Sequence, residues 1–143
     1  MEITTEACSI CHKHKSQEDA PPGGYIYEDG YWMVCHAPIN MGPLGTLMVE
    51  AKRHYLDYAD MTDAEAESYS RVLRRVYQVI HKFVDAERIY HVVTLEGEPH
   101  LHAWFLPRGR DVPERGLKLW QKDISCEEKD AIELVEKLRE AMK

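Results

Sequence analysis

The chain has 143 residues, of which 44% are hydrophobic and 30% charged, and its formal net charge at pH 7 is −7. This composition excludes an intrinsically disordered chain, and the length fits a single domain spanning residues 1–143. The acidic balance excludes the broad basic surface that gives proteins most of their affinity for duplex nucleic acid. It does not exclude a small anionic ligand, because one pocket needs only a few local donors.

The amino-terminal stretch "MEITTEACSICHKHK" contains no apolar run of signal-peptide length, and no window approaches the roughly 20 apolar residues of a membrane span. We therefore expect a cytoplasmic protein with no membrane partner. In a reducing compartment the Cys8-x-x-Cys11 pair indicates a metal half-site or a redox pair, in a small knuckle at the amino terminus. Cys35 and Cys126 are interpreted as small apolar fillers.

The first half of the chain predicts strands. Residues 16–25 contain Pro-Pro-Gly-Gly and indicate a loop, and residues 25–34 alternate aromatic and branched side chains around Asp29-Gly30, which is typical of a hairpin. Residues 46–52 predict a third strand that ends in water near Lys52 and Arg53.

Thr62 and Glu65 have capping-box spacing, and apolar residues recur at helical intervals after them, so we expect a long helix to about Val84. Residues 88–97 and 100–108 predict two further strands. Ser125 and Glu128 repeat the capping-box spacing before a shorter carboxy-terminal helix. This order predicts an α+β fold with an antiparallel sheet, one long helix and one carboxy-terminal helix.

A metal held by Cys8 and Cys11 needs two further ligands for a tetrahedral site. His12 and His14 are expected to be solvated, because a ligand next to Cys11 would crowd the turn. The remaining candidates, which the spacing alone does not separate, are His54, His100 and His102.

The stretch "HLHAWFLPR" (residues 100–108) alternates in the way that a strand requires. On one strand, His100, His102 and Trp104 would share a face. Leu101, Ala103 and Phe105 would pack on the opposite face.

The segment "PHLHAWFLPR" closely resembles the signature of the histidine triad superfamily, in which histidine alternates with apolar residues before a Pro-Arg ending. The segments "GTLMVEAKRHYLDYADMTDAE", "CSIC" and "YEDGYWMV" are also similar to its zinc-bearing bacterial and archaeal members. The resemblance covers residues 8–108 and implies a histidine triad fold, with residues 109–143 as a carboxy-terminal extension that contains a helix. It also implies a two-fold homodimer.

The resemblance implies a closed structural zinc site. In the zinc-bearing branch the ion is held by the amino-terminal cysteine pair, by the histidine after the basic strand and by the first histidine of the triad. Those positions correspond here to Cys8, Cys11, His54 and His100. A Cys₂His₂ set suits a structural ion, although iron could occupy the same ligands.

The resemblance also implies nucleotide chemistry. His102 matches the family's nucleophile, which attacks an α-phosphorus to form a phospho-histidine in nucleotide hydrolases and nucleotidyl transferases. The implied substrates are dinucleoside polyphosphates, nucleoside phosphoramidates or adenylylated adducts. Asn40, Trp104 and Arg108 are the candidate nucleotide contacts, Asn40 because Pro38 stands where many members have a ribose-binding Asp or Asn.

Trp104 replaces the third histidine of the family pattern. Its indole has one N–H donor, no acceptor and no cationic form, so it can contact a phosphate oxygen or a base but cannot act as a general acid. Three hypotheses follow. The first is a hydrolase or transferase acting through His102 with Trp104 beside it, the second a nucleotide-binding regulatory protein without turnover, and the third a zinc-stabilised interaction module.

Overall fold

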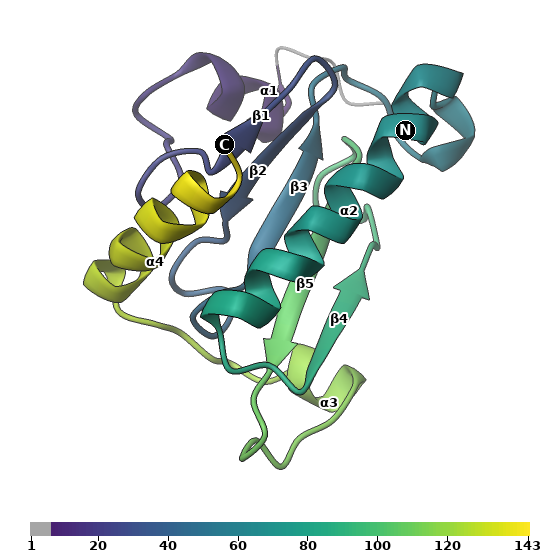
Figure 1. Ribbon diagram of the computed structural model, residues 1–143. Helices are drawn as coiled ribbons and strands as arrows, with labels where there is room; N and C mark the ends of the chain where they lie inside the picture. The colour runs from purple at the N-terminus through teal and green to yellow at the C-terminus, as the bar shows by residue number, and fades with distance from the viewer. Residues whose placement is uncertain (1–6) are drawn as a thin grey trace.

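The computed structural model describes residues 7–143, and residues 1–6, the start of the stretch searched for a leader peptide, lie outside that range. Five antiparallel strands form one sheet in the order β1-β2-β3-β5-β4 (Figure 1). The elements in chain order are α1 (Ser9–Lys15), β1 (Tyr27–Glu28), β2 (Trp32–His36), β3 (Leu47–Ala51), a 3₁₀ turn η1 (Tyr58–Asp60), α2 (Asp63–Phe83), β4 (Arg88–Val92), β5 (His102–Arg108), α3 (Leu117–Trp120) and α4 (Glu128–Ala141).

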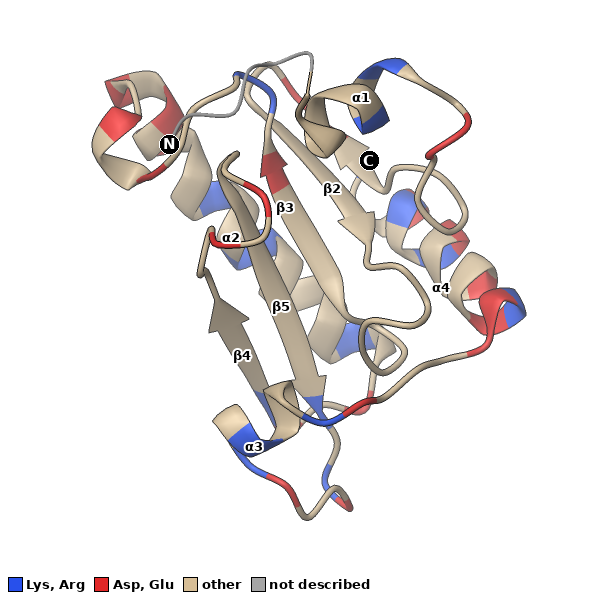
Figure 2. Cartoon of the chain, turned by 180° about the vertical axis from the view of Figure 1, so that it is seen from behind, with Lys and Arg blue, Asp and Glu red and all other residues tan. Residues whose placement is uncertain are grey.

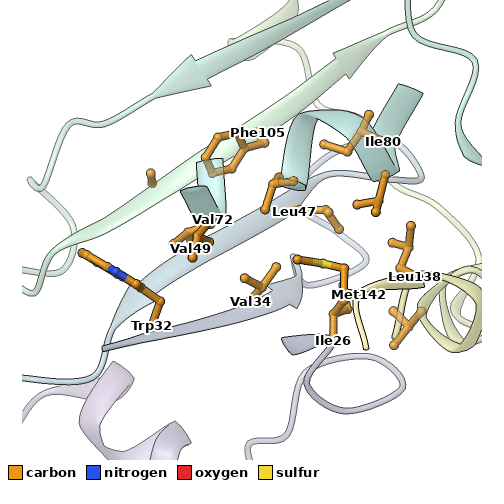
Figure 3. Close-up of a cluster of buried hydrophobic side chains, with 14 of the residues drawn as sticks. Ile26, Trp32, Val34, Leu47, Val49, Val72, Ile80, Phe105, Leu138 and Met142 are labelled. Carbon is orange, nitrogen blue, oxygen red and sulfur yellow. The ribbon is translucent and has the colours of Figure 1, made fainter. Parts of the chain in front are cut away.

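The predicted α+β class is confirmed, with helices on both sides of the sheet. Helices α2 and α4 cover one face, and the short helices α1 and α3 lie on the other (Figures 1 and 2). The main hydrophobic core fills the space under α2 and α4 (Figure 3). It includes Val34, Val49 and Phe105 from the sheet and Leu138 from α4, so the carboxy-terminal helix shares this core. Within residues 7–143, no helix is both long and apolar enough to cross a membrane.

Helix α2 forms where its sequence predicts. The Thr62 hydroxyl accepts the Glu65 N–H, and the Glu65 carboxylate accepts the Thr62 N–H, so the capping box satisfies two free amides of the first turn. Val72, Val76 and Ile80 then recur every four residues and are buried against the sheet.

The second predicted capping box is wrong. Helix α4 begins at Glu128, its N-cap is Glu127, and no side chain caps it. The preceding segment is instead tied to the loop after β2, because the Cys126 N–H donates to the Ile39 carbonyl (2.9 Å) and the Gly42 N–H donates to the Ile124 carbonyl (3.0 Å). These two backbone hydrogen bonds, on either side of Ser125, hold it outside the helix.

Strands β4 and β5 are shorter than their sequences predict. β4 ends at Val92 rather than near residue 97, and β5 begins at His102, so His100 lies in the loop that enters the strand. The His100 and Leu101 N–H groups donate to Glu98 and Tyr55 carbonyls instead of continuing the pairing with β4.

The connection between β2 and β3 depends on a glycine. Gly45 has φ +92°, and a Cβ there would lie 2.8 Å from a Val84 methyl group at the end of α2. Its N–H donates to Nε2 of the buried His36 (2.9 Å), whose Nδ1–H donates to the Ala37 carbonyl (2.7 Å). The left-handed backbone and the lack of a side chain let the loop approach α2 this closely.

Candidate active site and metal centre

Four potential metal ligands meet where α1 reaches the start of β5. Cys8, Cys11, His54 and His100 each offer one ligand atom, and these four atoms all lie within 4.8 Å of one another. The predicted knuckle is instead the first turn of α1, in which Cys8 is the N-cap and its sulfur accepts the Cys11 N–H. A helical turn therefore presents both sulfurs in the same direction.

The spacing of the ligand atoms fits one tetrahedral ion. Nδ1 of His54 and Nδ1 of His100 are 3.1 Å apart, and the Cys8 and Cys11 sulfurs lie 3.4 and 3.6 Å from Nδ1 of His100. Ligands at zinc–nitrogen and zinc–sulfur bond lengths would be separated by about 3.3 Å for a nitrogen pair and about 3.6 Å for a sulfur and a nitrogen. The site can thus take zinc with little movement.

Hydrogen bonding and burial prepare His100 as a ligand. Its Nε2–H donates to the Ala51 carbonyl (2.7 Å), which leaves the Nδ1 lone pair for the cluster. Burial lowers the pKa of His100 to about 4, so the ring is neutral at pH 7, and burial raises the pKa of Cys8 to about 11. A cation binding here would therefore displace a proton from the Cys8 thiol.

A cavity of about 790 Å³ lies beside this cluster, on the sheet face that carries α1 and α3. It is lined by α1, the loop after β2, the loop before β5, β5 itself and the segment around α3. His102, Trp104 and Asn40, three of the residues predicted to contact substrate, all line it. The strand alternation thus brings His102 and Trp104 into one cavity, while the loop conformation turns His100 toward the cysteines.

The ring orientation of His102 is fixed by the backbone. Its Nδ1–H donates to the His100 carbonyl at 2.6 Å, because a carbonyl oxygen can only accept. Nε2 is therefore the unprotonated nitrogen of a neutral ring. No residue of the described range 7–143 forms a hydrogen bond with it. A histidine held in this way can act as a nucleophile toward a ligand in the cavity.

Two tryptophans form an aromatic wall of the cavity. Trp104 on β5 and Trp120 on α3 contact edge to face, with ring centroids 5.6 Å apart, and Trp104 lies 6.3 Å from the His102 ring. Trp120 belongs to the extension beyond the segment that resembles the histidine triad proteins. Residues 109–143 therefore supply part of the cavity as well as a core helix.

Arg108 does not join this group. Its side chain is 2% exposed, its Nη2 donates to Glu87 (3.0 Å) and its Nε donates to the Tyr90 hydroxyl (3.1 Å), and it does not line the cavity. Arg108 therefore lies outside this cavity, because it ends β5 and its guanidinium is bonded to Tyr90 on β4 and to Glu87 just before β4. Its role as a nucleotide contact stays a prediction.

The acidic loop before β5 is held by hydrogen bonds to α1. Glu98 lines the cavity, but its carboxylate accepts the Ser9 N–H (3.1 Å) and the Ser9 hydroxyl (2.6 Å). Burial alone would raise the pKa of Glu98, yet the bonds from Ser9 leave it below its ordinary value. Glu98 therefore stays ionised and fastens this loop to α1.

Sequence analysis missed a polar cluster beneath α1. Glu50 on β3 is fully buried and accepts hydrogen bonds from Lys13, from His14 Nε2 (3.0 Å) and from the Tyr25 hydroxyl (3.1 Å). The expectation that His14 is solvated is therefore wrong, because the helix turns it onto Glu50. The available signal was a single carboxylate inside the apolar stretch 46–52, which needs buried partners.

No family model matches the sequence, and neither does any curated protein. Solved structures do match. A Zn-bound histidine triad family protein from Mycobacterium smegmatis superposes with a TM-score of 0.72 over 97% of both chains at 19% identity. A hypothetical histidine triad nucleotide-binding protein from Sulfolobus tokodaii strain 7 gives a TM-score of 0.65 over 82% of each chain at 18% identity.

A HIT family hydrolase from Clostridium thermocellum gives a TM-score of 0.58 at 18% identity, covering 78% of this chain and 98% of that chain. The chain therefore has the histidine triad fold, as its motifs predicted. The similarity to the protein from Mycobacterium smegmatis also extends through most of residues 109–143, because it covers nearly the whole chain.

Proposed function

We propose that this protein transfers nucleoside monophosphate groups to water or to another acceptor, with His102 as the nucleophile. The observation that carries the proposal is the His102 ring, which lines the cavity with Nδ1 bonded to the His100 carbonyl and Nε2 available. Similarity to structures named as a hydrolase and as a nucleotide-binding protein supports the substrate class.

In the proposed reaction, the Nε2 lone pair attacks the α-phosphorus of the substrate. A phosphorus–nitrogen bond forms as the bond from phosphorus to the leaving group breaks, and the leaving group departs with that electron pair. The ring keeps its Nδ1 proton and becomes an imidazolium, whose charge the His100 carbonyl stabilises. The oxygen of water or of another acceptor then attacks phosphorus, and the phosphorus–nitrogen bond breaks with its electron pair returning to Nε2. The acceptor's proton passes to solvent, and His102 is again neutral.

Trp104 sets the limits of this chemistry. Its N–H can donate to a phosphate oxygen, and its ring with that of Trp120 offers a surface for a base, but it has no proton to give the leaving group. Compounds with a good leaving group, such as a polyphosphate or a protonated amine, are therefore the preferred substrates. The same property favours a second candidate function, nucleotide binding without turnover.

The Cys₂His₂ cluster is proposed as a structural zinc site. A bound ion would cross-link α1 to the loop that enters β5 and to His54, through Cys8, Cys11 and His100. With four protein ligands such an ion would have no open position for water, so it would support the fold while the covalent step is assigned to His102.

We also propose a cytoplasmic homodimer. The outer strand β4 has one unpaired edge within the described chain, at the side of the sheet where α2 lies. Pairing of two such edges would extend the sheet across a two-fold axis. Light scattering should give twice the mass of the chain, and a mass of one chain would contradict this part of the proposal.

The decisive experiment compares native protein with His102→Asn, using adenosine phosphoramidate and diadenosine tetraphosphate as substrates. We expect release of AMP to fall by at least about a thousandfold, with unchanged metal content and melting temperature, because the variant lacks a nucleophile. His81→Asn, an exposed change on α2, is the matched control. Equal turnover by His102→Asn would refute the mechanism, and nucleotide binding without turnover by native protein would select the second candidate.

A further inference from the structure

Lys13 on α1 brings a positive charge to the wall of the cavity. It lines the same cavity as His102, and its side chain is 17% exposed. Its ammonium group donates to Oε2 of Glu50. Glu50 is the cross-strand partner of His102 in the β3–β5 pairing, so both side chains lie on the cavity face of adjacent strands. Lys13 and His102 thus line one cavity, and Glu50 is the bonding partner of the first and the strand neighbour of the second.

The partners of Lys13 leave part of its donor capacity unused. An ammonium has three N–H donors. One is given to Glu50 and a second points toward the Cys35 sulfur, 3.7 Å away. The other oxygen of Glu50 is supplied by His14 (3.0 Å) and Tyr25 (3.1 Å), so the carboxylate does not depend on Lys13 alone. One donor of Lys13 is therefore free to bond to a ligand.

Two other cations near the described cavity wall are less well placed. Lys122 also lines the cavity, but it donates to Glu114 (2.6 Å) and its side chain is 51% exposed, so water screens its charge more than that of Lys13. Arg108 is bonded to Glu87 and Tyr90 and does not line the cavity. Trp104 has no cationic form. A nucleoside monophosphate entering the cavity carries at least one negative charge, and Lys13 is the cavity cation that is bonded to the strand neighbour of His102.

We propose that Lys13 binds a phosphate oxygen of the nucleotide and supplies the positive charge that Trp104 cannot. This assignment rests on the proposed function and names the residue that recognises the phosphate. Glu50 then acts as a positioning residue, because it holds the ammonium against the cavity face of the sheet. A phosphate oxygen is then bound by a side chain of α1 rather than by a third histidine on β5.

The test is the ratio of two affinities. Native protein is titrated with each of the four nucleoside monophosphates and with the matching nucleosides, and the pair with the tightest monophosphate is kept. The ratio of nucleoside Kd to monophosphate Kd isolates the contribution of the phosphate. A charge-assisted hydrogen bond predicts a ratio of about ten to a hundred.

The variants are chosen so that folding does not obscure the answer. Lys13→Met leaves Glu50 buried without its cation and is expected to destabilise the protein. The double variant Lys13→Met with Glu50→Gln removes both charges together. We expect it to melt near the native temperature and to bind the nucleoside normally, with the ratio about tenfold lower than in native protein. Glu50→Gln alone keeps Lys13 and an amide oxygen that can still accept its hydrogen bond, so it should keep most of the ratio. Lys15→Met, on the exposed side of the same helix, should keep the native ratio.

Three results would overturn the assignment. A native ratio in the folded double variant would mean that another group binds the phosphate, while the proposed function stands. Equal loss of nucleoside and monophosphate affinity would mean that Lys13 only supports the fold. Native protein that binds neither ligand would instead remove the proposed function, and the role of Lys13 with it.

Discussion

His100 and His102 are two residues apart, yet the fold gives them opposite chemistry. His100 is fully buried beside two thiols, with Nε2–H bonded to the Ala51 carbonyl and Nδ1 facing the cluster. His102 lines a cavity, with Nδ1–H bonded to the His100 carbonyl and Nε2 available. The comparison teaches that a backbone carbonyl selects the tautomer, and that the surroundings of the other nitrogen decide between metal ligand and nucleophile.

The largest effect is expected from a change in the Cys₂His₂ cluster. Cys11→Ser removes one sulfur from the cluster, so we expect bound zinc to fall from one per chain to nearly none. The free energy of unfolding should fall by several kcal/mol, on the scale of about 5, because ion binding is coupled to the fold of α1. Metal analysis and urea denaturation measure the two effects.

Cys126→Ser is the matched control, because Cys126 lies in the segment before α4 and outside the cluster. It should retain zinc and nearly all stability. Normal zinc content in Cys11→Ser, or equal losses in both variants, would show that the four residues do not form the metal site.

A smaller effect is expected from a change in the aromatic wall of the cavity. Trp120→Leu removes one ring of the aromatic wall, so nucleoside affinity should weaken by roughly tenfold. Zinc content should not change, because Trp120 is not one of the four cluster residues. Isothermal titration gives the affinity, and Leu117→Ser, at an exposed position of the same helix, is the control. If the control lost as much affinity as Trp120→Leu, the aromatic wall would have no special role.

His36 differs from His100 and His102, because backbone groups form hydrogen bonds with both of its ring nitrogens. Burial lowers its pKa below the ordinary 6.5, although the bond to Ala37 opposes that shift. The unfolded chain then takes up the proton first as pH falls. The stability that His36 contributes is complete above about pH 6.5 and is lost progressively below it.

The smallest effect is expected from the protonation of His36. Metal-free native protein should lose more stability between pH 7.5 and pH 5 than metal-free His36→Gln, whose amide does not titrate in that range. Urea midpoints at the two pH values measure the difference. Parallel losses in the two proteins would mean that His36 is not the group that titrates.

Local features of the sequence predicted the parts of the fold that local chemistry determines. The Thr62 and Glu65 capping box and the apolar repeat after it specify α2, since both act within one or two turns. The period-two alternation correctly placed His102 and Trp104 on one face of β5. The same local reasoning failed at Ser125, where backbone bonds to the loop after β2 compete with the cap.

The candidate site could be predicted only where the resemblance supplied long-range information. Spacing alone did not choose among His54, His100 and His102, because the selection depends on where α1 meets the loop before β5. Lys13 and Glu50 are 37 residues apart, and no local pattern pairs them. Arg108 was predicted to contact phosphate from the bidentate bonding that arginine favours, but Glu87, beside the neighbouring strand β4, forms an ion pair with it, and no local pattern in the sequence joins the two.

The most direct test of the central claim is to map the covalent intermediate. Native protein mixed with adenosine phosphoramidate is quenched within one turnover, digested at neutral to alkaline pH, and analysed by peptide mass spectrometry. We predict one adenosine monophosphate group on His102 and none on His100, whose free nitrogen faces the cysteine cluster. An adduct on any other residue, or turnover without an adduct on His102, would contradict the division of roles between the two histidines.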